Sequence, residues 1–366
     1  MAGAQARRAF QTLDGLRGVG AFLVVMRHVP FFFGPVRVPE SFLAVDLFYL
    51  VSGFVVAHAY AERLKAGGFF WTFVKTRLIR LYPLYFFGLA IGLITAAYDV
   101  WTDPHGWWSW SKIGWGVGTG LFLIPMFPGL PANGTTLDGP TWTLIPELIA
   151  NFVYAALIRF LNLWVLLTIV AVSAAGVIGA EFLYRGLDVG YSPTDQWAAL
   201  ARVGFSFFIG VVVFRFFGDR EVDNEWVAWA CMLVLTVMLA FRPSQAFTPY
   251  YELGVVLLGF PALLVVAARF EPGPVTGKAF SLIGLVSYGV YIVHQPLGNL
   301  AHSLVRRFIR IPGDWRGLGF GAVFLAGCFL LAWWLDGAYD APVRKLLRAR
   351  FMKERPKPLK AQPAAS

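Results

Sequence analysis

LDGLRGVGAFLVVMRHVPFFF, residues 13–33, is a mostly apolar stretch that carries three basic side chains, Arg17, Arg27 and His28. From Val19 to Phe33 it predicts a membrane helix, because its length and hydrophobicity suit a bilayer. On insertion scales, an ionisable side chain deep in lipid costs about 2.5–3.5 kcal/mol. Keeping such residues at this cost indicates a function, and His28 is the first candidate for chemistry.

The composition indicates an integral membrane protein. Hydrophobic residues make up 58% of the 366 residues and charged residues only 14%, whereas a soluble domain carries about 25% charged residues. The apolar runs are separated by short loops, so we expect one membrane domain at 1–343. Cys231 and Cys328 fall inside apolar runs, which argues against a disulfide, and no metal site is expected.

A basic tail follows at 344–366. It holds eight Lys and Arg residues against one acid, Glu354, directly after the last hydrophobic run, and this pattern is typical of a cytoplasmic anchor. The net charge of +10 does not indicate nucleic-acid binding, because no soluble nucleic-acid-binding fold accompanies the basic residues. We expect the end of the tail, from Arg355 to Ser366, to be disordered.

The hydrophobic runs predict an all-α polytopic membrane helical bundle with about ten transmembrane helices. Each span needs about 17–25 mostly apolar residues, and the first run lacks the cleavage pattern of a signal peptide. The expected spans are 14–33, 42–60, 80–98, 141–160, 163–184, 198–217, 226–241, 251–268, 280–299 and 317–336.

Basic residues predict the orientation of the bundle. The amino terminus, the loop after the second span and the tail are all basic and therefore cytoplasmic. Counting spans from both ends leaves 99–112 and 128–140 on the outer face. The short, glycine-broken stretch 113–127 between them is therefore expected to be an outer re-entrant segment, which must be buried in protein or line a cavity.

One loop opposes this layout. Residues 300–316 carry four arginines and fall on the outer face by the count. The loop is either a binding face for anionic glycan or lipid headgroups, or a tolerated basic loop.

Depth along the expected helices, at about 1.5 Å per residue, separates two polar zones. Arg17, Arg77 and Arg80 fall at the cytoplasmic end, where arginine forks suit a phosphate-bearing donor. His28, Glu147 and His294 fall in the outer half, where an imidazole oriented by a carboxylate suits general-base chemistry on a hydroxyl. The alternatives are simple interfacial anchoring for the arginines and a hydrogen-bonded structural role for the histidine.

Two further ionisable residues have no clear role in these zones. Asp46 stands near the outer end of the second span and is also explained as a helix-start cap. Arg27 remains without a role, and an ion pair with Glu147 or Asp46 is one hypothesis.

Five polar motifs fall inside or beside the expected spans. They are LDGLRG with Arg27-His28 at 13–28, VDLFYLVSGF at 45–54, TRLIRLYP at 76–83, PTWTLIPEL at 140–148 and SYGVYIVHQPL at 287–297. In this order they resemble the motifs of the acyltransferase type 3 family of integral membrane O-acyltransferases.

The resemblance implies transfer of an acyl group, usually acetyl, from cytoplasmic acyl-coenzyme A to a hydroxyl of a glycan or lipid-linked saccharide at the outer face. We expect a multi-pass protein of the inner (plasma) membrane, in contact with membrane lipids and without a metal cofactor, with both termini cytoplasmic as the basic residues indicate. The expected catalytic residues are His28 and Glu147. The residues expected to hold the acyl-CoA (acetyl-CoA) co-substrate are Arg17, Arg77 and Arg80. The residues expected to contact the substrate are Asp46, Ser52, Trp142, Tyr288 and His294.

The chain departs from the family pattern at two positions. Thr143 replaces the usual serine but keeps the hydroxyl, and Leu148 replaces a frequent acid, so a second carboxylate role is absent. We expect no esterase-like domain after the last span, and therefore expect the membrane domain to complete the transfer alone or to hand the acyl group to a separate protein.

Two other function classes compete with acyl transfer. A transporter or flippase would use the same polar residues as a substrate path, although no internal repeat supports it. A structural scaffold is disfavoured by the many ionisable residues inside the spans.

Overall fold

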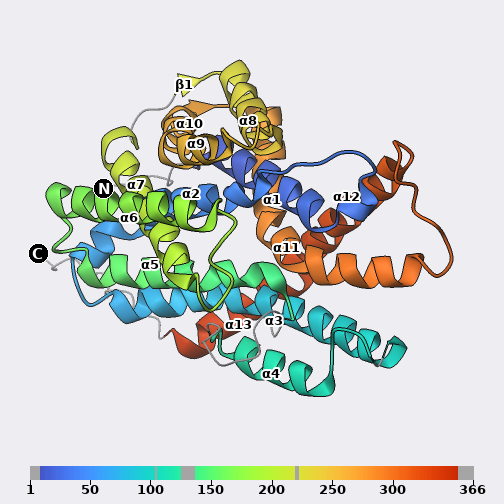
Figure 1. Cartoon of the computed structure of the whole chain (residues 1–366). Coiled ribbons are helices and arrows are strands. Elements are labelled where there is room, and N and C mark those ends of the chain that lie inside the picture. The colour runs from blue at the N-terminus through green and yellow to red at the C-terminus, as the bar shows by residue number, and fades with distance from the viewer. Residues whose placement is uncertain (1–8, 104, 125–136, 219–221, 353–366) are drawn as a thin grey trace, which may run out of the picture.

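The computed structural model describes residues 9–103, 105–124, 137–218 and 222–352. Within these ranges the chain is almost entirely helical, as expected (Figure 1). A single pair of two-residue strands, β1 (Val222–Asp223) and β2 (Phe270–Glu271), runs parallel, with Val222 opposite Phe270.

The helices follow one another with short connections. The α-helices are α1 (Gln11–His28), α2 (Ala44–Lys65), α3 (Phe70–Thr102), α4 (Trp110–Leu121), α5 (Leu144–Leu157), α6 (Leu163–Tyr184), α7 (Gln196–Phe217), α8 (Glu225–Ala240), α9 (Thr248–Gly254), α10 (Phe260–Ala267), α11 (Pro274–Val305), α12 (Gly317–Leu335) and α13 (Ala341–Phe351). Short 3₁₀ turns are η1 (Pro30–Phe32), η2 (Ser41–Leu43) and η3 (Gly139–Thr143), and single π-turns are η4 (Val255–Gly259) and η5 (Asp336–Asp340).

Among the described residues, 7 helical segments are long and apolar enough to cross a membrane. They are 41–65, 70–102, 163–184, 196–217, 248–267, 274–305 and 317–351, and they contain or overlap seven of the ten expected spans. The other three, at 14–33, 141–160 and 226–241, do not meet this criterion. Helices α5 and α8 have only 14 and 16 residues, about 21 and 24 Å at 1.5 Å per residue, and the hydrocarbon core is about 30 Å thick.

Helix α1 packs most extensively against α11, and it also contacts α8 and α2. The close approach depends on glycines on both helices. A side chain at Gly18 would overlap Ile283, and one at Gly284 would overlap Asp14. Small residues at a helix interface let the backbones approach closely, which is how membrane helices commonly associate. This contact brings His28 of α1 beside His294 of α11.

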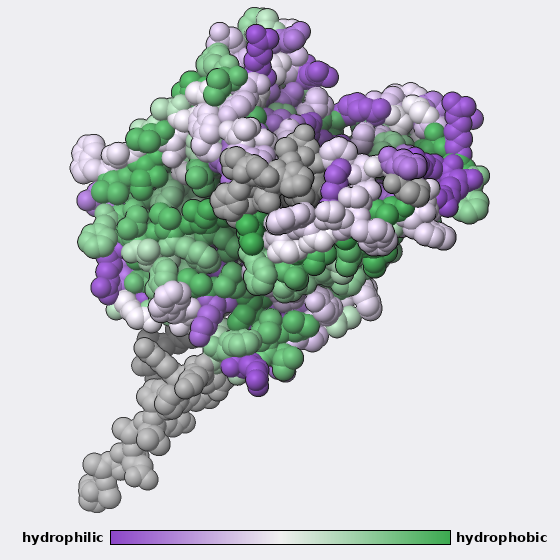
Figure 2. All heavy atoms as spheres, turned by 60° about the horizontal axis from the view of Figure 1, so that its bottom comes forward, coloured by the Kyte–Doolittle hydropathy of each residue, from purple (hydrophilic) through white to green (hydrophobic). Residues whose placement is uncertain are grey.

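Helix α4 covers residues 113–121 of the expected re-entrant segment and packs beside α3 (Figure 1). Residues 125–127 of that segment lie outside the described residues, and its entry into the membrane stays a prediction. Several tryptophans near α4 are exposed, among them Trp107, Trp110 and Trp115. Figure 2 shows a broad hydrophobic area on one face of the molecule, as expected for a surface in contact with lipid.

The expected domain boundary after residue 343 falls inside α13, which extends α12 through the π-turn η5 and packs against α3. Lys75 of α3 donates a hydrogen bond to the carbonyl of Phe351. The first part of the basic tail is therefore helical. The part expected to be disordered, 355–366, lies outside the described residues.

Candidate functional site

The three arginines of the predicted donor zone line one cavity of ≈ 300 Å³. Arg17 comes from α1, and Arg77 and Arg80 come from successive turns of α3. Glu147 is the other charged side chain among the described lining residues, so the arginines leave the cavity cationic. Ser52, Tyr288 and Tyr291 add hydroxyl groups to its wall.

The sequence predicted that Glu147 lies in the outer zone with His28. The structure places it in the arginine cavity instead. Its Oε1 accepts hydrogen bonds from the Ser52 hydroxyl at 2.7 Å and from Arg77 Nη2 at 3.1 Å. The depth estimate was wrong because it began α5 at the outer surface. Residues 139–143 instead form the turn η3, whose Thr141 and Thr143 are buried, and α5 begins only at Leu144. Glu147 therefore holds Arg77 in place.

His28 and His294 form a hydrogen-bonded pair at the end of α1. His294 Nε2 lies 3.1 Å from His28 Nδ1, and the ring centroids are 5.0 Å apart. His294 Nδ1 lies 3.1 Å from the carbonyl of Val290, which only accepts, so Nδ1 carries the hydrogen. In a neutral His294 ring, Nε2 therefore accepts a hydrogen bond from His28 Nδ1–H. His28 Nδ1 also lies 3.1 Å from the carbonyl oxygen of Val24.

This arrangement fixes the tautomer of His28. In a neutral imidazole, the hydrogen bond made by one ring nitrogen decides whether the other nitrogen is protonated. Because Nδ1 of His28 carries the hydrogen, its Nε2 carries the lone pair. His28 Nε2 makes no hydrogen bond within the part of the chain that the structure describes. His294 is fully buried, whereas His28 is half-buried. His28 can therefore act as a base, and His294 orients it.

Tyr291 connects the histidine pair to the arginine cavity. Its ring centroid lies 5.9 Å from that of His294, and the same residue lines the cavity. Its hydroxyl lies 3.0 Å from the Thr143 hydroxyl and 3.1 Å from the carbonyl of Pro140. The sequence analysis did not single out Tyr291, although it lies within the motif at 287–297 and its spacing of three from His294 gave a signal.

Asp46 is enclosed in an ion pair. Its Oδ2 accepts from Arg202 Nη2 at 2.6 Å, and the two side chains are only 0% and 1% exposed. Arg202 also donates to the carbonyl of Val189. Asp46 therefore ties α2 to α7 and has no exposed oxygen for a substrate, contrary to the expected substrate contact. The sequence could not reveal this role, because the partner lies far along the chain.

Arg27 pairs with neither Glu147 nor Asp46. Its Nη2 lies 2.5 Å from Asp188 Oδ2, its Nη1 donates to the carbonyl of Pro39 at 2.6 Å, and its guanidinium lies over the Phe42 ring. It therefore anchors the loop between α6 and α7 next to His28.

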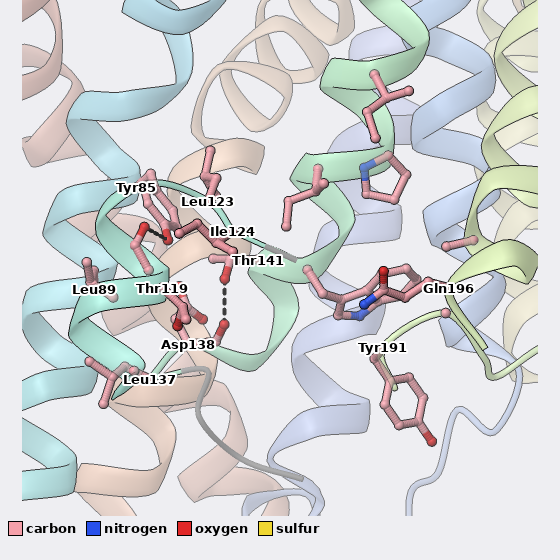
Figure 3. A pocket seen from close by; sticks show the side chains of 18 of the residues that line it. Tyr85, Leu89, Thr119, Leu123, Ile124, Leu137, Asp138, Thr141, Tyr191 and Gln196 are labelled. Carbon is pink, nitrogen blue, oxygen red and sulfur yellow. Dashed lines mark hydrogen bonds between the residues drawn. The ribbon is translucent and has the colours of Figure 1, made fainter. Parts of the chain in front are cut away.

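The two remaining expected substrate contacts line different cavities. Tyr288 lines the arginine cavity, and its hydroxyl donates to the carbonyl of Leu81 at 2.8 Å. Trp142 lines a second cavity of ≈ 120 Å³, formed by α3, α4, the segment from η3 to α5, and the chain around Tyr191 and Gln196 (Figure 3).

Comparison with known proteins gives one family match. The family model described as an acyltransferase domain matches residues 10–336. "Protein 2 in picA locus" of Rhizobium radiobacter is 42% identical over 162 residues, which are 40% of this chain and 81% of that protein. The peptidoglycan O-acetyltransferase OatA of Listeria monocytogenes is 21% identical over a match that covers 93% of this chain and 56% of that protein. No solved structure shows a significant match.

Proposed function

Since the chain belongs to the acyltransferase family whose domain matches residues 10–336, we propose that it acylates a saccharide hydroxyl at the outer face of the plasma membrane, using cytoplasmic acyl-coenzyme A. Acetyl is the proposed acyl group, because the Listeria monocytogenes relative is a peptidoglycan O-acetyltransferase. Both termini are proposed to be cytoplasmic, from the basic residues that flank the first and last helices.

The observation that carries this proposal is a chain of side-chain contacts between a cationic cavity and an imidazole nitrogen that has no hydrogen-bond partner among the described residues. Arg17, Arg77 and Arg80 line the cavity, Tyr291 lines it as well, and the Tyr291 ring contacts His294. His294 in turn holds His28. We expect a donor anchored by its phosphates in the cavity to place its thioester on the side of the histidine pair.

The arginines supply the donor site. Guanidinium groups bind phosphate oxygens through two parallel hydrogen bonds. The single Glu147–Arg77 ion pair, at 3.1 Å, leaves Arg77 further N–H groups to donate. Arg17 donates only at 3.4 Å, to Asp14 and Ser287, so both contacts are weak and exchangeable for a phosphate.

His28 performs the proton transfer. Its Nε2 removes the proton of the acceptor hydroxyl as that oxygen attacks the thioester carbonyl. The new C–O bond forms, the C–S bond breaks, and the departing thiolate takes the proton back from His28 Nε2. His294 accepts the Nδ1 hydrogen throughout and keeps the ring in the required orientation.

Replacement of His294 tests this orienting role. We expect His294→Phe to lower kcat by roughly tenfold or more with little change in KM, because the His28 Nδ1–H loses the acceptor on His294 and keeps only the Val24 carbonyl of its own helix. His294→Gln keeps an acceptor and should restore part of the activity. The measurement is the rate of acetyl transfer by purified protein. Equal losses for the two variants would contradict the orienting role.

Conservative replacement of the arginines tests the donor site. We expect Arg80→Lys and Arg17→Lys to weaken binding of acetyl-coenzyme A by roughly tenfold, because lysine cannot form the two parallel bonds. Arg316→Lys is the matched control, since Arg316 is exposed and pairs with Asp314 far from the cavity. Isothermal titration with acetyl-coenzyme A measures the effect, and unchanged affinity in both variants would remove the arginines from the donor site.

The cellular test compares the O-acyl content of the surface glycans with and without this gene by NMR. We expect a loss of O-acetyl groups, restored by the wild-type gene and not by His28→Ala. Purified protein that neither binds nor hydrolyses acetyl-coenzyme A, yet moves a saccharide into vesicles, would establish transport instead.

A further inference from the structure

The arginine cavity ends before the two histidines. Its lining residues on α1 are Arg17 and Ala21, and on α11 the lining ends at Tyr291, three residues before His294. Among the described residues that line the cavity there is neither His28 nor His294. The proposed reaction needs the thioester beside His28, so the side of the cavity that faces the histidine pair must open during the reaction.

Two aromatic rings close this side of the cavity. Phe48 of α2 and Tyr291 of α11 both line it, and their rings meet edge to face, with centroids 5.7 Å apart and an interplanar angle of 88°. The tip of the Phe48 ring rests on α1 at Gly20, where an added Cβ would lie 3.0 Å from Cε1 and 3.3 Å from Cζ. The Tyr291 ring lies beside that of His294, with centroids 5.9 Å apart. The two rings therefore bridge α1, α2 and α11 between the arginines and the histidine pair.

Phe48 is the ring of this pair that can turn. The Tyr291 hydroxyl lies 3.0 Å from the Thr143 hydroxyl and 3.1 Å from the carbonyl of Pro140, so the far end of its ring is held. Phe48 has no polar atom in its side chain, and turning it breaks no hydrogen bond. It is half-buried and borders the open space of a cavity of ≈ 300 Å³, so its ring has room to move aside.

A closed side keeps the donor from reacting with water. His28 Nε2 makes no hydrogen bond within the described part of the chain, and it can take a proton from water as well as from a saccharide. In that side reaction the water oxygen attacks the thioester carbonyl, the C–S bond breaks, and His28 returns the proton to the thiolate. The products are acetic acid and free coenzyme A. Closing an active site against water prevents such hydrolysis.

We propose that Phe48 makes the reaction specific for a saccharide hydroxyl over water. Its ring separates a thioester in the arginine cavity from His28 while the acceptor is absent, and it turns aside when a saccharide lies beside His28. The saccharide contacts the thioester only in the open state, so its binding favours opening. The inference rests on the proposed function, because it concerns the choice of acceptor in that reaction.

Hydrolysis of acetyl-coenzyme A by the full chain in detergent, without acceptor, tests this role. We expect Phe48→Ala to raise the release of free thiol at saturating donor by roughly tenfold or more, because water and thioester then meet at His28. Phe48→Leu keeps more of the packing against Gly20 and should show a smaller rise in the same direction. Since the added hydrolysis needs the base, Phe48→Ala combined with His28→Ala should return to the wild-type rate.

Phe22→Ala is the matched control. Phe22 is also half-buried, and its ring stacks on Phe329 of α12 with centroids 6.4 Å apart, outside the arginine cavity. This variant should hydrolyse acetyl-coenzyme A at the wild-type rate. An unchanged rate in both Phe48 variants, or a rise that persists without His28, would overturn the role of Phe48.

Titration with acetyl-coenzyme A and the rate of acetyl transfer, measured on the same samples, separate the two proposals. A wild type that binds the donor and transfers acetyl, with hydrolysis unaffected by either Phe48 variant, would overturn the role of Phe48 and leave the proposed function standing. A wild type that neither binds acetyl-coenzyme A nor transfers acetyl would contradict both.

Discussion

His28→Ala is expected to lower the rate of acetyl transfer by a factor of about 10²–10⁴, the usual contribution of a positioned general base. The reason is that His28 Nε2 carries the lone pair and makes no hydrogen bond within the described residues, so it is the group available to the acceptor hydroxyl. Binding of acetyl-coenzyme A should be unchanged, because His28 does not line the arginine cavity. Radiolabelled acetyl transfer and titration with acetyl-coenzyme A measure the two effects.

The control for this variant is His302→Ala. His302 lies on the same helix as His294, and its ring stacks on Phe31 with centroids 4.0 Å apart, away from the histidine pair. This variant should retain transfer. If His28→Ala is inserted, folded and fully active, His28 is not the base.

Asp46→Ala is expected to destabilise the protein by about 3–5 kcal/mol, because it leaves the Arg202 guanidinium buried without its carboxylate. A loss of this size is a large fraction of the about 5–15 kcal/mol that stabilises a typical protein. Unfolding in detergent with increasing SDS, followed by tryptophan fluorescence, measures it. Asp314→Ala, which breaks the exposed pair with Arg316, should leave stability unchanged.

A double variant separates the structural role of Asp46 from a substrate contact. Asp46→Leu with Arg202→Met replaces the buried pair by apolar side chains, a change that is often neutral. We expect this variant to recover stability and acetyl transfer. A stable Asp46→Ala protein that loses only acceptor binding would show instead that Asp46 contacts the substrate.

The sequence predicted the helical class and most spans, because hydrophobic runs report directly on burial in lipid or protein. It was less accurate where a helix is short. The expected span began at Thr141, but residues 139–143 form a 3₁₀ turn before α5. Hydropathy averages over such a turn, so the resulting shift of Glu147 from the outer zone to the arginine cavity could not be foreseen.

Two groupings from the sequence analysis recur in the structure, while the roles of their residues stay predictions. Arg17, Arg77 and Arg80 line one cavity, and His28 contacts His294, although neither grouping is adjacent in sequence. The partners of Asp46 and Arg27 were missed because Arg202 and Asp188 lie far along the chain. Long-range pairing depends on how helices pack, which periodicity along one helix does not report.

The same limit explains why the sequence analysis did not single out Phe48. It is one of several aromatic residues in the motif at 45–54, and its residue type alone indicates no role. Its contacts with Gly20 and Tyr291 exist only in the folded chain.

Transfer across a sealed bilayer tests the central claim most directly. Wild-type protein is reconstituted into vesicles with labelled acetyl-coenzyme A on the side of its basic tail and de-O-acetylated glycan from the host cell on the other. We predict that label reaches the glycan in wild-type vesicles and not in His28→Ala vesicles. Labelled glycan only when donor and acceptor share one side, or equal labelling by His28→Ala, would contradict the account.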